Sequence, residues 1–231
     1  MTSRVAISSL FFLNGFLLAQ WVSRIPALSA GLDLSSAQLG AALFGIAVGS
    51  LLAFPLSGLL ITQRGSHHTT ISFALFFAVT LPLLALAPNL PLLFLALMLF
   101  GAGVGGMDVA MNAQGVEVEK QADKAVMSSL HGFFSLGGFL GAGLGGLLAS
   151  LNVTPLLHFA SVAVAAVLIT STVARFLIAD EEVAEAAPVF ALPPHRRQPR
   201  RAPRAPSAAG QTLELCLQPL HPLSRTAQQP K

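Results

Sequence analysis

Residues 91–115, PLLFLALMLFGAGVGGMDVAMNAQG, decide the fold class of this 231-residue chain. The run is continuously apolar and is long enough to supply the roughly 20 helical residues that cross a hydrocarbon core about 30 Å thick. Barrel strands would instead alternate apolar and polar residues over about ten positions, so this run predicts a membrane-spanning α-helix. One acidic residue, Asp108, interrupts it and is the first candidate functional position.

Five more apolar runs of similar length predict an all-α integral membrane protein, built as a six-transmembrane-helix bundle. The expected spans are Val5–Ile25, Ser36–Ile61, Thr70–Ala87, Pro91–Gly115, Val126–Ser150 and Pro155–Ile178. Only 10% of the residues are charged and 54% are hydrophobic, whereas soluble domains carry about 25% charged residues. This composition excludes a soluble enzyme and a nucleic-acid-binding protein. The first run is longer than a signal-peptide core of about 7–15 residues, so we expect it to be retained.

Positive charges between the spans predict the orientation. Those expected on one side of the membrane are Arg4, Arg64, Lys120, Lys124 and Arg175. Cytoplasmic loops carry an excess of Lys and Arg, so we expect a multi-pass protein of the cell (inner) membrane with both termini in the cytoplasm. We expect no metal or cofactor, because the single cysteine, Cys216, excludes an intrachain disulfide and a cysteine-based zinc site.

The composition changes near residue 187 and divides the chain into a membrane bundle, residues 1–187, and a second segment, residues 188–231. Nine of the 15 prolines lie in the second segment, together with most of the arginines that give the chain its net charge of +3. It has no apolar periodicity, which predicts a disordered cytoplasmic tail. Contact of this basic tail with anionic lipid is an alternative.

Glycines recur every four residues in the fifth expected span, at Gly137, Gly141 and Gly145. Apolar helices associate in lipid through close backbone packing, which small residues allow. The ridge therefore predicts tight helix packing. A smooth surface on which helices slide during a transport cycle is the alternative.

Polar residues inside the spans are costly in lipid and are candidates for a solute or proton pathway. Asp108 and Asn112 are four residues apart and share one helix face. At 1.5 Å per residue, Asp108 and His131 lie at compatible depths of about 16 Å and about 10 Å, so we expect a hydrogen bond between them. A carboxyl group in such a site binds and releases protons. Asn14 and Gln20 in the first span complete the predicted pathway.

Two further ionisable residues are expected to anchor or pack. Arg24 lies about 30 Å along the first span, so we expect it to snorkel to the outer surface or to pair with Asp33. His158 is the only ionisable residue in the last span before Arg175, and we expect a satisfied packing residue.

Several segments carry a resemblance to a known family. They are residues 11–15 (FFLNG), 21–26 (WVSRIP), 106–114 (GMDVAMNAQ) and 127–138 (MSSLHGFFSLGG). They resemble the major facilitator superfamily (MFS), in particular its small bacterial proteins related to fucose permeases, over about residues 4–190. The resemblance implies the N-terminal half of the MFS fold, a 3+3 inverted repeat, and secondary transport by alternating access. It also implies that Asp108 and Asn112 take the places of an acidic residue and an asparagine associated with proton coupling.

The chain departs from this family in its loop between the second and third spans. The family pattern is G-x-L-[A/S]-D-R-x-G-R-[R/K], in which the charged residues gate the inter-helix contacts. Here Gly58, Arg64 and Gly65 remain as candidates for the gating loop, whereas Thr62 and Gln63 replace the Asp and the following Arg. The first span also lacks the carboxylate of fucose permeases, so the resemblance does not specify a sugar.

The family has two six-span bundles, and this sequence has one. The Pro/Arg-rich string after Pro193 resembles the wrong reading frame of a GC-rich gene, so we expect a truncated half-transporter with a frameshift-derived tail. The inward polar face of such a half would meet lipid or a second half-transporter copy.

These observations predict transport of a small polar solute, sugar-like or another metabolite, by proton-coupled alternating access, and no enzymatic activity. The expected partners are the solute, protons, the lipid bilayer and a second copy, with no nucleic acid. Two alternatives stay open. One is a non-transporting assembly or signalling subunit, and the other is a rhomboid-like intramembrane hydrolase, for which only a Ser135–His158 pair is available.

Overall fold

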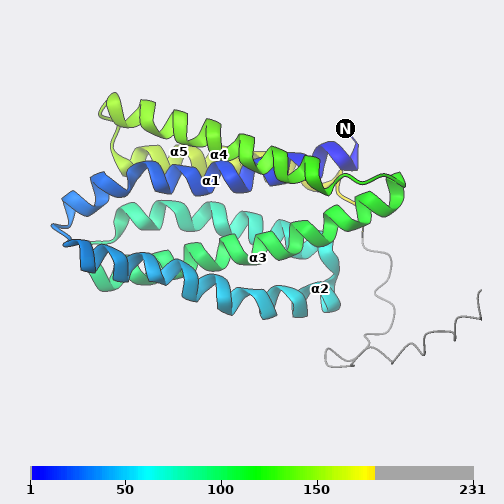
Figure 1. Ribbon diagram of the computed structural model, residues 1–231, viewed down its shortest axis with the longest axis horizontal. Helices are drawn as coiled ribbons and strands as arrows, with labels where there is room; N and C mark the ends of the chain where they lie inside the picture. The colour runs from blue at the N-terminus through cyan, green and yellow to red at the C-terminus, as the bar shows by residue number, and fades with distance from the viewer. Residues whose placement is uncertain (1, 180–231) are drawn as a thin grey trace, which may run out of the picture. The chain divides into compact units, whose positions relative to one another are not determined.

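The computed structural model describes residues 2–179, which form helices joined by short turns. The helices, in chain order, are α1 (Ser3–Gly31), α2 (Ser36–Leu86), α3 (Leu90–Ala122), α4 (Met127–Ser150) and α5 (Pro155–Ala174) (Figure 1). Each of the five is long and apolar enough to cross a membrane. The predicted tail, residues 188–231, lies outside the described residues.

The expected count of six spans is not confirmed, because the second and third expected spans both lie in α2. This helix has 51 residues, and a straight helix of that length would extend about 77 Å. The backbone leaves the helical region at Gly65, where φ is 81° and ψ is 167°, a conformation that glycine adopts at little cost. Gly65 therefore divides α2 into two arms, residues 36–64 and 66–86.

The two arms of α2 pack against α3 in opposite directions. The contacts are those of Gly45 with Phe94, Ser57 with Gly106, Phe77 with Gly103 and Ser66 with Gln114. In the first two pairs, residue numbers rise together along both helices. In the last two, they rise on α3 while they fall on α2. The first arm is thus parallel to α3 and the second antiparallel, so α2 is a helical hairpin about Gly65 (Figure 1).

Side-chain caps set the beginnings of four helices, and Thr2 caps α1. Ser35 and Gln38 form a reciprocal capping box at the start of α2. The side chains of Asn89 and Thr154 accept from backbone N–H groups at the starts of α3 and α5. These contacts satisfy donors that have no partner within the helix, and they allow the helices to be joined by very short turns.

The glycine ridge of α4 lies against α1. A methyl group on Gly137 would collide with the carbonyl oxygen of Phe12, and one on Gly141 would lie 2.7 Å from the carbonyl oxygen of Phe16. Residue numbers rise together along this seam, so α1 and α4 are parallel. The absence of side chains at the glycines brings the two backbones into direct contact.

The α4 helix is covered on its α1 side and open on the other. Its buried residues are Leu130 and the three glycines of the ridge. The opposite face carries exposed apolar side chains, of which Phe139 is 76% exposed. In a membrane protein, such a face is suited to lipid or to another apolar protein surface.

Candidate solute and proton site

Asp108, Asn112 and His131 lie where α3 approaches α4. The side-chain amide of Asn112 donates to the backbone carbonyl of Asp108 at 2.8 Å and to its carboxylate Oδ1 at 3.2 Å. The His131 ring is near enough to interact electrostatically with that carboxylate. Asp108 and Asn112 are half-buried and His131 is exposed. The three side chains thus form one polar patch with access from outside the bundle.

The predicted hydrogen bond between Asp108 and His131 is wrong. No hydrogen bond joins the two in the described part of the chain, where the carboxylate is bonded to Asn112. The His131 ring instead packs edge-on against Phe11 of α1, with the ring centroids 5.3 Å apart and an angle of 82° between the planes. The depths of the two residues match, but the rotation of α4 turns the imidazole toward α1.

Asn14 places a buried amide on the α1 side of this patch. The side chain is 1% exposed, and its Nδ2 donates to the sulfur of Met111 at 3.5 Å, which is a weak acceptor. Its Oδ1 is buried and has no hydrogen-bond partner within residues 2–179. An unsatisfied buried acceptor is destabilising, so this oxygen is available to a water or to a donor group.

A second polar cluster, formed by Gln20, Arg24 and His158, joins α1, α4 and α5. Arg24 Nε donates to His158 Nδ1 at 2.9 Å, and His158 Nε2 lies 2.7 Å from Gln20 Oε1. Gln20 Nε2 donates in turn to the carbonyl of Gly141 at 3.2 Å. Because arginine only donates, His158 Nδ1 must accept and the ring proton must lie on Nε2. Each residue of the series therefore donates to the next: Arg24 to His158, His158 to Gln20, and Gln20 to the backbone of α4.

This Gln20–His158–Arg24 cluster corrects the predictions for Arg24. The side chain is 3% exposed, and it neither snorkels to the surface nor pairs with Asp33, because His158 accepts its hydrogen bond inside the bundle. Arg24 Nη2 has no partner. His158 is fully buried and hydrogen-bonded, but its partners are a cation and an amide rather than the apolar surroundings of a packing residue.

Gln20 differs from the other predicted pathway residues in being hydrogen-bonded within this cluster. It lies six residues beyond Asn14 on α1, which is about 9 Å along the axis. The sequence did contain a signal for the cluster, since Gln20 and Arg24 are four residues apart and share one helix face. His158 follows closely after the start of the last span, on the same side of the membrane as Arg24.

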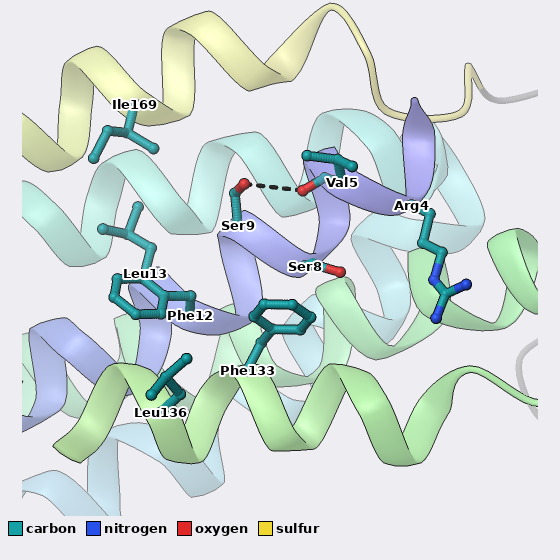
Figure 2. A pocket seen from close by; sticks show the side chains of 9 residues that line it. All are labelled: Arg4, Val5, Ser8, Ser9, Phe12, Leu13, Phe133, Leu136 and Ile169. Carbon is teal, nitrogen blue, oxygen red and sulfur yellow. Dashed lines mark hydrogen bonds between the residues drawn. The ribbon is translucent and has the colours of Figure 1, made fainter. Parts of the chain in front are cut away.

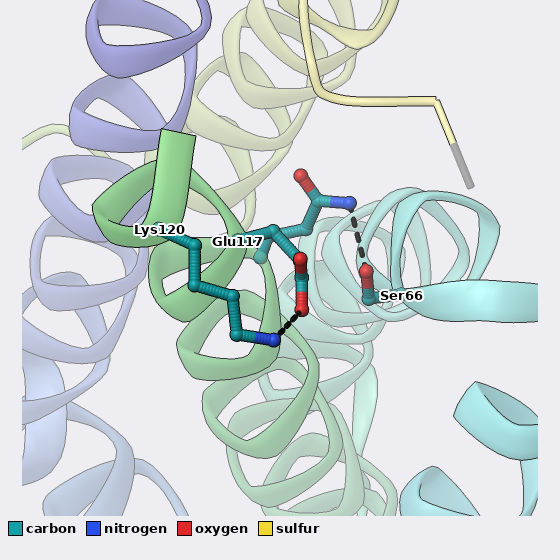
Figure 3. A network of polar contacts seen from close by, with 4 residues as sticks. Ser66, Glu117 and Lys120 are labelled. Carbon is teal, nitrogen blue, oxygen red and sulfur yellow. Dashed lines mark hydrogen bonds and ion pairs between the residues drawn. The ribbon is translucent and has the colours of Figure 1, made fainter. Parts of the chain in front are cut away.

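The predicted gating residues Gly58, Arg64 and Gly65 lie at or near the hairpin of α2. Gly65 forms the turn itself, Arg64 is exposed, and a methyl group on Gly58 would meet nothing within 4 Å. The next residue, Ser66, accepts a hydrogen bond from Gln114 Nε2 at 2.9 Å (Figure 3). A neutral hydrogen bond thus attaches the turn to α3. The family pattern has charged residues in this loop instead.

The charged turn at the end of α3 lies beyond the apolar part of that helix and outside the predicted span Pro91–Gly115. Lys120 Nζ and Glu117 Oε1 form an exposed ion pair at 2.7 Å (Figure 3). Glu119 Oε2 accepts from the backbone N–H groups of Val126 at 2.7 Å and Met127 at 3.1 Å. These two hydrogen bonds hold the pKa of the Glu119 carboxyl below its ordinary value, because they favour the charged form. Glu119 thereby caps the start of α4.

The hydrolase alternative depends on a Ser135–His158 pair. The Ser135 hydroxyl donates to the carbonyl of His131, one turn back on its own helix, at 3.1 Å. His158 is occupied within the buried cluster. The Ser135–His158 pair that this alternative requires is therefore not formed.

The sequences of known transporters match this chain. The profile of the Major Facilitator Superfamily matches residues 6–219. An uncharacterized transporter of Sinorhizobium fredii is 41% identical over 171 residues, which are 74% of this chain and 44% of that protein. An uncharacterized MFS-type transporter of Yersinia pestis is 34% identical over 193 residues, which are 84% of this chain and 50% of that protein. The chain thus spans about half the length of these curated relatives.

A solved transporter shares the fold. The crystal structure of the nucleoside transporter NupG superposes with a TM-score of 0.61 at 17% identity, covering 79% of this chain and 48% of that one. None of these matches names a fucose permease, so they support the superfamily and not that branch. Because the family profile covers most of the sequence and these relatives are named as transporters, one of them as MFS-type, the chain belongs to the Major Facilitator Superfamily.

Proposed function

We propose that this chain supplies one wall of a proton-coupled pathway for a small polar solute. The Asp108–Asn112 pair carries the proposal. An ionisable side chain inside a membrane helix is energetically costly, and such residues typically mark solute or proton pathways. The carboxylate is half-buried and hydrogen-bonded, with His131 close by. The unpaired Oδ1 of Asn14 adds an acceptor for a solute hydroxyl or amine.

Proton binding to Asp108 would change the hydrogen bonds around it. The charged carboxylate accepts from Asn112 and lies near His131, and its interaction with each weakens when the carboxyl is neutral. The amide of Asn112 is then more available to a solute oxygen. The desolvation penalty in a low-dielectric environment is also smaller for the neutral carboxyl than for the anion. The proton would thus couple to solute binding and to the change of access.

Helix directions support six crossings of the membrane. The seam of α1 with α4 is parallel, so an odd number of crossings must lie between them. The chain between them contains only α2 and α3, and α2 is a hairpin with two antiparallel arms. Three crossings follow if each arm of α2 crosses once. With Arg4, Arg64, Lys120 and Lys124 on one side, the positive-inside rule would put that side and both termini in the cytoplasm of an inner-membrane protein.

The other wall of the pathway would come from a second six-span unit, either a separate polypeptide or a second copy of this chain. Two observations support this part of the proposal. The chain spans about half the length of its curated relatives, and His131 of the Asp108 patch is exposed on the surface of the bundle. In alternating access, the two units rock about a site at their interface, which is where Asp108 and His131 would then lie.

Uptake into liposomes tests the proposal. The purified chain is reconstituted, a pH gradient is imposed, and the uptake of a panel of radiolabelled sugars, amino acids and nucleosides is measured. Nucleosides are included because the structural neighbour is a nucleoside transporter. We expect Asp108→Asn to reduce gradient-driven uptake at least tenfold and Asn112→Ala to reduce it less.

Asp33→Asn is the matched control. Asp33 is an exposed aspartate in the turn between α1 and α2 with a positive φ of 50°, which asparagine also tolerates. This substitution should leave uptake unchanged. Gradient-driven uptake that persists in Asp108→Asn would refute proton coupling through this residue. A wild-type chain that takes up none of the panel would favour a non-transporting assembly subunit.

A further inference from the structure

A cavity of about 590 Å³ lies between the beginnings of α1 and α4 and the later part of α5 (Figure 2). Its apolar lining comes from Val5, Phe12, Leu13, Phe133, Leu136 and Ile169. Arg4 lies at one end of it, at the start of α1. Its volume is within the range of about 300–1,000 Å³ that is typical of small-ligand pockets.

The polarity of this cavity changes along its length. The Arg4 guanidinium makes no ion pair or hydrogen bond in the described part of the chain, and its side chain is exposed. Farther along α1, the lining is aliphatic and aromatic. Of the two serines in the wall, Ser9 donates to the carbonyl of Val5 at 2.9 Å and Ser8 is 8% exposed. The cavity therefore combines a free cation at its mouth with an apolar interior.

The length and depth of the cavity match one leaflet of a bilayer. Arg4 and Leu13 are nine residues apart on α1, which corresponds to about 14 Å at 1.5 Å per residue. This is about half of a hydrocarbon core of about 30 Å. If Arg4, at the start of α1, marks the membrane surface, then Leu13 lies near the middle of the bilayer.

The cavity lies on the opposite side of α1 and α4 from the candidate solute site. At about 100° per residue, Leu136 is about 140° around α4 from His131. On α1, Phe12 is likewise rotated by about 100° from Phe11, which contacts His131. Phe133, Leu136 and Ile169 are each more than two-fifths exposed. The cavity thus opens away from the solute site, and its opening is apolar.

We propose that this cavity binds an anionic phospholipid, with one acyl chain between α1, α4 and α5 and the phosphate group at Arg4. The apolar interior matches the acyl chain, and the unpaired guanidinium matches an anionic headgroup through charge-assisted hydrogen bonds. A second copy of the chain would instead bring an apolar surface to the whole opening and leave Arg4 without an anion. This proposal does not depend on the transport function, because the two sites lie on different faces.

Tryptophan quenching by brominated lipids tests the proposal in the full-length chain. Ile169→Trp places a reporter in the cavity wall, and the native Trp21, which is 1% exposed, gives the background. Vesicles contain phosphatidylcholine with a minor fraction of brominated phosphatidylglycerol or of brominated phosphatidylcholine. We expect the anionic lipid to be preferred about fivefold at this reporter, the ratio that corresponds to about 1 kcal/mol per cation near the surface.

Two substitutions and a second reporter separate the cavity from the bulk membrane. Arg4→Gln should abolish the preference, whereas Lys124→Gln, which removes another exposed cation, should preserve it. Leu168→Trp places the reporter on the adjacent residue, which is 63% exposed, and should show no preference. Equal quenching by the two lipids at residue 169, or a preference that survives Arg4→Gln, would overturn the proposal. Absence of quenching by either lipid would also overturn it, since a protein surface would then cover the cavity.

Discussion

The two polar clusters described above differ in whether their hydrogen bonds join separate helices. In the Gln20–His158–Arg24 cluster, three buried side chains form a continuous series that ends on a backbone carbonyl. In the Asp108–Asn112 patch, a half-buried carboxylate has one side-chain hydrogen bond, from its own helix. A closed network rigidifies the helices that it joins, whereas an incompletely bonded one can exchange partners. We infer that the first cluster serves stability and the second serves solute and proton binding.

The largest expected effect on stability is that of His158→Ala, which tests the structural role of the closed cluster. The substitution removes the acceptor of Arg24 and leaves a buried cation without a partner, which typically costs about 3 kcal/mol or more. We expect a corresponding fall in the free energy of unfolding in detergent micelles. His131→Ala is the control: its ring is exposed, and we expect a cost of no more than about 0.5 kcal/mol. Equal losses of unfolding free energy for His158→Ala and His131→Ala would contradict a stabilising role that belongs to the first cluster alone.

A smaller loss is expected for Gly137→Ala, which perturbs the seam that holds α1 and α4 in contact. The added methyl group would collide with the backbone carbonyl of Phe12, and overpacking of this kind costs about 1–3 kcal/mol. Gly143→Ala is the matched substitution on the open face of α4, where a methyl group meets nothing within 4 Å. We expect it to be neutral or slightly stabilising in a thermal unfolding assay. A destabilised Gly143→Ala would show that the open face is packed in the folded protein.

Gln20→Leu should cost less again, because it removes two hydrogen bonds of the closed cluster but leaves Arg24 bonded to His158. Hydrogen bonds between membrane helices contribute about 0.6 kcal/mol each on average, so we expect a loss of about 1 kcal/mol. If Gln20 were part of the solute pathway, Gln20→Leu would abolish uptake at unchanged stability. Measuring both quantities on one preparation distinguishes the two roles.

The smallest effect is expected at the charged turn, where the polar contacts are exposed. Glu119 has a pKa below its ordinary value because two backbone N–H groups donate to the charged carboxylate. It therefore contributes stability that is present above the ordinary glutamate pKa and is lost as the pH falls through the lowered one. Glu119→Gln should lessen the acid-side fall in unfolding temperature, and Glu117→Gln should not. An identical pH profile for Glu119→Gln and wild type would contradict this role.

Counting residues along the sequence predicted the position of a side chain along its helix better than its direction around the helix axis. The apolar runs located every helix, and the spacing of Asp108 and Asn112 placed them on one face, where they are hydrogen-bonded. The same counting predicted compatible depths for Asp108 and His131. Which residue each side chain contacts depends, however, on how its helix is rotated about its axis. That rotation is set by the glycine seam between α1 and α4, which pairs residues more than a hundred positions apart.

Two other features could not be predicted from local pattern alone. Gly65 forms a turn tight enough that helical bonding continues on both sides of it, so the two expected spans became one element. The bond between Arg24 and His158 joins residues 134 positions apart and depends on α5 packing beside α1. The expected spans put Arg24 and His158 toward the same side of the membrane, which allowed a contact between them. The local sequence did not show which helices are neighbours.

Part of the seam between α1 and α4 repeats every four residues on both helices. Gly137 and Gly141 meet the carbonyls of Phe12 and Phe16, whereas Gly145 lies against the side chain of Ser23. A slide of α4 by four residues, about 6 Å, would set Gly137 against the carbonyl that Gly141 now meets, so the repeated pairs fix the spacing of the two helices but not by themselves their register. The Gln20–His158–Arg24 cluster has no equivalent one turn away, so it selects one register, as a single polar residue does in a coiled coil. Releasing it would leave α4 free to step along α1 and to carry His131 past Asp108.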